Sequence, residues 1–151
     1  MGVAKTSAMP NTNRPHSPAA SPSTTTAEAT SLLIRRRDLP GSPQAHRFIG
    51  AEHGRLPISL FLVDDRPGAG PRLHRHPYPE LFIIHAGRAD FEIDRIRLIA
   101  TAGDILIAPA QTAHRFTNTG NEQLAITAIH TAPTINTEWL QPAQHTQGTP
   151  C

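Results

Sequence analysis

The regular alternation of short apolar runs with glycine- and proline-containing turns constrains this chain more than any other feature. The apolar runs cover residues 57–64, 81–85, 105–108 and 124–131, and turn-forming residues follow each of them. No segment keeps a helical period over the roughly 11 residues that identify an amphipathic helix. Short strands at close spacing are typical of an all-β sandwich or barrel, in which closing or doubling the sheet protects its edges. We therefore predict an all-β barrel.

The clearest strand is residues 88–94, where apolar and acidic side chains alternate. Ala89, Phe91 and Ile93 share one face, and acidic side chains occupy the positions between them. Residues 95–100 are predicted to pair with this strand as a hairpin. Further strands are expected at residues 32–37, 45–49, 72–76 and 113–118. Trp139 and Leu140 are expected to form a short helical turn that packs on the barrel.

Composition divides the chain into three predicted segments. Residues 1–30 are rich in Ser, Thr, Pro and Ala and hold almost no large apolar side chain, so we expect a disordered low-complexity tail. Residues 31–140 are predicted to form the folded domain, and residues 141–151 a flexible C-terminal tail. The N-terminal tail explains why only 38% of the chain is hydrophobic, against roughly 45–50% in globular proteins.

Charge and cysteine content exclude several classes of function. The net charge is only +2 and most arginines are scattered, so we expect no nucleic-acid partner. The chain lacks both a membrane-length apolar run and the apolar core of a signal peptide. The single cysteine, Cys151, permits neither an intrachain disulfide nor a Cys-based zinc site. These features fit a cytoplasmic protein that does not contact membranes.

Residues 68–87 contain the side chains best suited to chemistry. His74 and His76 are two positions apart, so in an extended strand both imidazoles face the same side. Glu80 has the same parity, although Pro77 and Pro79 interrupt the strand between them. Two imidazoles and a carboxylate from one segment suggest a metal site, which needs a further ligand from elsewhere.

Together with residues 103–118, this stretch resembles the two sequence motifs of the cupin family. The glycine, histidine and glutamate positions of the first motif are occupied by Gly68, His74, His76, Glu80 and Gly87. The second motif matches at Gly103, Pro109, His114 and Asn118. Gln111 stands where the family usually has glycine, so nine of ten fixed positions agree. The departure at Gln111 affects the turn before the strand that carries His114.

The resemblance covers roughly residues 57–131 and implies both a fold and a site. The implied fold is a cupin-type jelly-roll β-barrel, also called a double-stranded β-helix. The resemblance implies that one divalent metal ion per chain is held by His74, His76, Glu80 and His114. It also implies a homodimer, in which residues 31–49 would be exchanged between the subunits.

The donor set leaves the metal and the reaction open. Three imidazoles and one carboxylate suit Fe(II), Mn, Co, Ni, Cu or Zn, and Fe, Mn, Ni and Zn divide the reaction classes. Four protein ligands on an octahedral ion leave two positions for a small molecule. The leading hypothesis is a small-molecule metalloenzyme that performs dioxygenase-like oxidation or metal-assisted isomerase, lyase or decarboxylase chemistry. The alternatives are a non-catalytic binding or sensing module with a metal-anchored ligand, and a purely structural metal site.

Three further residues are candidates for roles in such a site. Arg72 shares the parity of the two motif histidines and could bind a substrate carboxylate, or could face water at the barrel mouth. Tyr78 could donate a proton, or could pack with its hydroxyl at the surface. His130 shares a face with Ile126 and Ala128. If that face is inward, His130 is an acid/base candidate or a group that orients a ligand; otherwise it is a core histidine.

Overall fold

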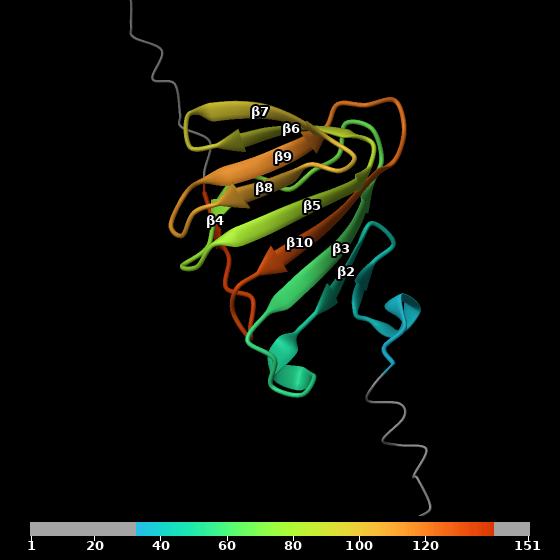
Figure 1. Ribbon diagram of the computed structural model, residues 1–151, viewed down its shortest axis with the longest axis vertical. Helices are drawn as coiled ribbons and strands as arrows, with labels where there is room; N and C mark the ends of the chain where they lie inside the picture. The colour runs from blue at the N-terminus through green and yellow to red at the C-terminus, as the bar shows by residue number, and fades with distance from the viewer. Residues whose placement is uncertain (1–32, 141–151) are drawn as a thin grey trace, which may run out of the picture.

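The described chain, residues 33–140 of a computed structural model, folds into two antiparallel β-sheets (Figure 1). One sheet has six strands in the order β1-β2-β3-β10-β5-β8, and the other has five in the order β11-β4-β9-β6-β7. The strands of the first sheet are β1 (Gly41–Ser42), β2 (Ala45–Phe48), β3 (Ser59–Asp65), β10 (Leu124–His130), β5 (Glu80–Ala86) and β8 (Ile105–Ala108). Those of the second are β11 (Glu138–Trp139), β4 (His74–Arg75), β9 (His114–Asn118), β6 (Arg88–Ile93) and β7 (Ile96–Thr101). Two short 3₁₀ helices complete the elements: η1 (Arg36–Asp38) and η2 (Gly50–Glu52).

The all-β prediction is confirmed, and the core lies between the two sheets. In β10 every second residue, from Leu124 to His130, is buried. The alternation read from residues 88–94 is also correct, since Ala89, Phe91 and Ile93 of β6 are buried. Phe91 packs against Phe82 and Phe116, with ring centroids 5.1 and 5.3 Å away. The period of two in these strands therefore identifies the face that is removed from water.

The strand predicted at residues 32–37 is wrong over the part that the structure describes. Arg36–Asp38 form η1 instead, and Leu33 and Ile34 are exposed. Strand β2 already has β1 and β3 as neighbours, so β2 offers these residues no free edge. Arg36 forms an ion pair with Asp64 and donates to the carbonyl of Leu62, which fixes the turn against β3.

The helical turn predicted at Trp139 and Leu140 is also wrong. Trp139 belongs to strand β11, and the N–H of Leu140 donates to the carbonyl of Leu73 at 2.9 Å. Strand β4 pairs with β9 on one side only, and β11 covers its other side. Pairing with the edge of β4 that β9 leaves open, rather than local helix propensity, makes residues 138–139 a strand.

The expected tails at residues 1–30 and 141–151 lie outside the described residues. Between residues 33 and 140, no helix has the length and hydropathy needed to cross a bilayer.

The turn before β9 keeps its left-handed conformation although glutamine replaces the usual glycine. Gln111 has φ of 61°, and its N–H donates to the carbonyl of His76 at 2.7 Å. The backbone therefore has the left-handed geometry that a glycine adopts without strain and a glutamine adopts at a cost in free energy. Replacing the usual glycine by Gln111 therefore leaves the turn geometry unchanged and adds backbone strain at this exposed residue.

Replacement Gln111→Gly is expected to raise the free energy of unfolding by roughly 0.5–1 kcal/mol. Glycine removes the cost of a left-handed side-chain residue, and part of that gain is lost to the greater entropy of glycine in the unfolded chain. Urea denaturation measures the difference. Gln111→Ala is the matched control, because alanine removes the same side chain but keeps the strained φ, so an equal gain from alanine would disprove this explanation.

Candidate metal centre

Four buried side chains converge between the sheets; we call His74, His76, Glu80 and His114 the ligand cluster. His74 begins β4 and lies directly opposite His114 of β9, where the two strands pair. Glu80 begins β5 in the other sheet. The proline-containing segment between His76 and Glu80 thus carries the chain from one sheet to the other, which brings the carboxylate opposite the imidazoles.

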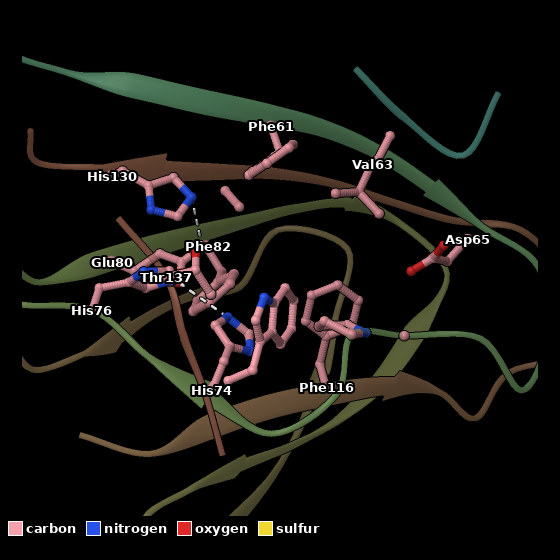
Figure 2. Close-up of a pocket in the computed structure, with 15 residues that line it drawn as sticks. Phe61, Val63, Asp65, His74, His76, Glu80, Phe82, Phe116, His130 and Thr137 are labelled. Atoms are coloured by element: carbon pink, nitrogen blue, oxygen red, sulfur yellow. Dashed lines mark ion pairs between the residues drawn. The ribbon is translucent and has the colours of Figure 1, made fainter. Parts of the chain in front are cut away.

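The ligand atoms of the cluster all lie within 4.8 Å of one another. Glu80 Oε2 is 2.7 Å from His114 Nε2, 3.0 Å from His76 Nε2 and 4.0 Å from His74 Nε2. Figure 2 shows His74, His76 and Glu80 gathered at one end of a cavity. One carboxylate oxygen therefore faces three imidazole nitrogens at once.

Backbone carbonyls fix the orientation of all three rings. The Nδ1 atoms of His74, His76 and His114 lie 2.7, 2.7 and 2.8 Å from the carbonyl oxygens of Arg72, Asn136 and Thr112. Because a carbonyl can only accept, each Nδ1 carries a proton, and Nε2 is the nitrogen that presents a lone pair when the ring is neutral. The carbonyl contacts are the interactions that orient metal-binding histidines in proteins.

This arrangement fits a cation at the centre of the cluster. Three lone pairs and a carboxylate oxygen facing one another repel unless a positive charge lies among them. His76 Nε2 is buried and has no hydrogen-bond partner in the described part of the chain. A divalent transition metal satisfies all four donor atoms together, whereas a single proton satisfies one imidazole.

The protonation states agree with ligation near neutral pH. Burial lowers the pKa of His74 to about 4, so this ring is neutral at pH 7. Burial alone would raise the pKa of Glu80, but the close contacts with His114 and His76 outweigh it and lower the pKa to about 2. Burial opposes the charge of His76 as well, yet the Glu80 carboxylate, with Oε2 3.0 Å from Nε2, and the carbonyl of Asn136 raise the pKa above its ordinary value. When His76 is protonated, its Nε2 must therefore lose the proton before a metal can bind there.

His130 is the fourth buried histidine of this region and contacts the other oxygen of Glu80. It lies opposite Glu80 where β10 pairs with β5, and its Nε2 is 3.2 Å from Glu80 Oε1. Burial lowers its pKa to about 4, so the ring is neutral and can carry its proton on Nε2. The inward face considered for Ile126, Ala128 and His130 is the face observed.

Tyr78 and Arg72 are placed at the edge of the site. The ring of Tyr78 stacks on His76 at 5.4 Å, and its hydroxyl accepts from the N–H of Asn136 at 2.7 Å. Burial raises the pKa of the Tyr78 hydroxyl. Arg72 is exposed, and its guanidinium carbon lies 5.0 Å from the ring centroid of Trp139. Neither residue belongs to the lining of the cavity beside the cluster.

A cavity of about 300 Å³ opens beside the ligand cluster (Figure 2). His74, His76, Glu80 and His130 line one end of it, and most of the remaining wall is apolar. Gly70 also lines the wall, where a Cβ atom would lie 2.0 Å from the carbonyl oxygen of Phe116. Glycine is required at this close approach of two backbone segments.

Asp65 and Trp139 also line this cavity, and neither was predicted from the sequence as a site residue. Strand β3 extends one residue beyond the predicted run of residues 57–64, so that Asp65 shares the face of Phe61 and Val63. Extending the period-two pattern of residues 57–64 by one position would have found it. Trp139 enters through the pairing of β11 with β4, for which the sequence holds no local signal.

Comparison with known proteins places these features in a family context. Residues 61–130 match the family model of the cupin domain. Auxin-binding protein 1 of Arabidopsis thaliana is 26% identical over 103 residues, which are 60% of this chain and 52% of that protein. Protein SchB of Streptomyces halstedii is 33% identical over 85 residues, which are 56% of this chain and 58% of that protein. The chain therefore spans about half the length of the curated relatives that it matches.

Among solved structures, oxalate decarboxylase of Bacillus subtilis has the same fold. The TM-score is 0.62 at 22% identity, and the match covers 68% of this chain and 29% of the decarboxylase chain. At this identity the likeness is one of fold, and the chemistry has to be argued from the site itself.

Proposed function

We propose, from the premise that residues 61–130 of this chain are a cupin domain, that the protein is a metal-dependent enzyme acting on a small organic molecule. The observation that supports this most is that the ligand cluster borders the cavity instead of being sealed in the core. A structural site encloses its ion completely, whereas a catalytic site keeps positions open for a substrate. Here the open positions would face the cavity.

The ligand cluster would hold one divalent ion, with Fe, Mn, Ni and Zn as the candidates. The ion would supply Lewis acidity for isomerase, lyase or decarboxylase chemistry, or, if it is iron, dioxygenase-like oxidation. Manganese is a specific candidate because the structurally similar Bacillus subtilis decarboxylase has Mn(II) centres.

The chain's own residues would orient the substrate and exclude water. The apolar wall formed by residues such as Phe61, Phe82 and Phe116 lowers the local dielectric, which strengthens electrostatic contacts at the site. His130 is the acid/base candidate, since it lines the cavity and its Nδ1 has no hydrogen-bond partner among residues 33–140. The hydroxyl of Tyr78 is held by Asn136, so we assign it no proton transfer.

Turnover with defined metals tests this proposal. Metal-free protein would be reloaded anaerobically with Fe(II), Mn(II), Ni(II) or Zn(II), and each form given a panel of small carboxylic acids and phenols. Substrate loss is followed by NMR, and oxygen uptake by an electrode. We expect one metal to support turnover that His114→Ala abolishes. Metal-dependent binding of panel compounds without turnover by any form would contradict an enzymatic role.

A non-catalytic binding module is the second candidate, and one comparison favours it. The relative from Arabidopsis thaliana is, by its name, an auxin-binding protein. In such a module the metal would anchor a small molecule that is released unchanged. The turnover panel separates the two candidates, because both expect metal-dependent binding but only the enzyme consumes its ligand.

The contact between His130 and Glu80 should contribute to metal affinity. His130→Phe preserves most of the ring volume but removes the N–H that faces Glu80 Oε1, so this oxygen loses its partner and the carboxylate is less well oriented. We expect metal affinity to fall by about 10- to 100-fold, measured by competition with a chelator. His85→Phe is the control, since His85 is exposed and contacts Thr127 on β10. Equal affinity of His130→Phe and wild type would exclude this orienting role.

The homodimer remains a prediction. Strand β2, which lies in the segment expected to be exchanged, pairs with β3 of its own chain here. On the edge strand β8, Ile105 and Ile107 are 63% and 59% exposed, and they offer a different apolar edge for association.

A further inference from the structure

Asp65 stands at the far end of the cavity from the ligand cluster. It is the last residue of β3 and is only 9% exposed. It lines the same cavity as Glu80 and His130. In Figure 2 it lies at the opposite end of the lining from these two residues, with Val63 and Phe116 between the ends. The cavity therefore has a polar group at each end.

The carboxylate of Asp65 has no cationic or hydrogen-bonding side-chain partner within residues 33–140. Its neighbour Asp64 points away and pairs with Arg36, whereas Asp65 takes part in the hydrogen bonding through its backbone. Burial, together with the charge of Asp64, raises the pKa of Asp65. The Asp65 oxygens are not among the fully buried atoms that lack a partner, so they reach the solvent of the cavity. A single carboxylate exposed to a mostly apolar cavity is the kind of polar group that orients a ligand by accepting its hydrogen bond.

The backbone of Asp65 is held rigidly in this position. Asn118 Nδ2 donates to the carbonyl of Asp65 at 2.9 Å and to that of Glu122 at 2.8 Å, and its Oδ1 accepts from the N–H of Gly120. Asp65 also pairs with Leu124 across β3 and β10. Because the backbone is fixed, only the short side chain of Asp65 has to be ordered when a ligand binds, which limits the entropy lost.

The wall between the two ends is suited to a flat apolar body. Phe61, Val63, Phe82, Phe116 and Trp139 contribute to it, and the volume of about 300 Å³ lies at the small end of the range for ligand sites. A single ring with short substituents fits such a space, and aromatic side chains favour stacked or edge contacts with it.

We propose that Asp65 is a specificity-determining residue for an apolar, ring-containing molecule that bears a metal-binding oxygen at one end and a hydrogen-bond donor at the other. The donor is a hydroxyl or ammonium group that would be held by the Asp65 carboxylate. The part of this proposal that concerns the metal-binding oxygen rests on the proposed function. The part that concerns the hydrogen-bond donor rests on Asp65 alone.

Binding to the zinc-loaded full chain tests the assignment. The only tryptophan of the chain, Trp139, lines the cavity and reports binding by fluorescence. The probes are benzoate, phenylacetate and phenylpropanoate, each compared with its para-hydroxy and para-aminomethyl derivatives to cover a range of lengths. In the wild type we expect at least one derivative to bind about tenfold more tightly than its parent acid.

Variants at residues 64 and 65 show whether Asp65 causes this preference. Asp65→Val should bind parent and derivative equally, while Asp64→Asn should keep the wild-type ratio. Asp65→Asn, which changes the shape least, should lose more of the preference for the ammonium probe than for the hydroxyl probe. Near-ultraviolet circular dichroism checks that each variant is folded. The proposal is overturned if no derivative is preferred, if no probe binds, or if Asp65→Val keeps the preference.

The same titrations with metal-free protein report separately on the proposed function. Weaker binding of the parent acids without zinc supports the metal anchor. Unchanged binding without zinc contradicts the anchor but leaves the comparison at Asp65 intact, because that comparison depends only on the ratio between derivative and parent.

Discussion

Replacement of His114 by alanine is expected to abolish stoichiometric metal binding. The variant removes one of four donor atoms, and the remaining three come from the single segment of residues 74–80. Loss of a contact that merely orients a ligand already costs up to about 100-fold in affinity, so loss of the ligand itself should cost more. Elemental analysis after dialysis against a weak chelator measures the effect.

Folding has to be checked in the same variant, because His114 is 2% exposed and packs near Phe82. The cavity left by alanine is expected to destabilise the fold by about 2–5 kcal/mol. His114→Gln keeps most of the volume and still removes the imidazole, so it should lose the metal at a smaller cost in stability. His85→Ala changes an exposed histidine and should keep one ion per chain. A folded His114→Gln protein that retains a full equivalent of metal would contradict the assignment of this ligand.

Acidification is expected to weaken metal binding, beginning close to neutral pH. The metal binds the deprotonated ring, and the pKa of His76 is raised above 6.5 by its contact with Glu80. Below that pKa a proton must leave His76 before the metal binds, so apparent affinity should fall about tenfold for each pH unit. His74, with a pKa of about 4, takes up a proton only in more acidic solution. Glu80, with a pKa of about 2, stays charged throughout.

Chelator competition between about pH 8 and pH 5 measures this dependence. We expect a flat region at the alkaline end and a slope of at least one proton per metal ion below neutral pH. His85→Ala should give the same curve, because His85 lies outside the cluster. An affinity that is constant across the whole range would mean that His76 does not ligate the metal.

Strands with alternating burial could be predicted from the sequence because the period of two records which side chains leave water. The pairing of residues 88–93 with 96–101 follows directly from this pattern and a tight turn. The errors at residues 32–37 and at Trp139 have a different cause. Whether an apolar segment becomes a strand depends on whether a sheet edge is free to pair with it, and local sequence carries no information about that edge.

The ligand cluster could be proposed from the sequence because the motif spacing fixes residue types at close positions. What holds each ring could not be proposed. The carbonyl that orients His76 belongs to Asn136, which is 60 positions away and beyond the motifs. The place of Asp65 beside the cavity likewise depends on how far β3 extends, and this is set by its pairing with β10.

The most direct test of the central claim, that the ligand cluster holds one divalent transition metal, is elemental analysis of the full chain purified anaerobically. We predict one equivalent of Fe, Mn, Ni or Zn per chain in the wild type, and less than a tenth of an equivalent, by order of magnitude, in His114→Gln. The identity of the ion then selects between oxidation and Lewis-acid chemistry. Wild-type protein that binds no equivalent of any of these four ions, even after each is supplied in excess, would contradict the account.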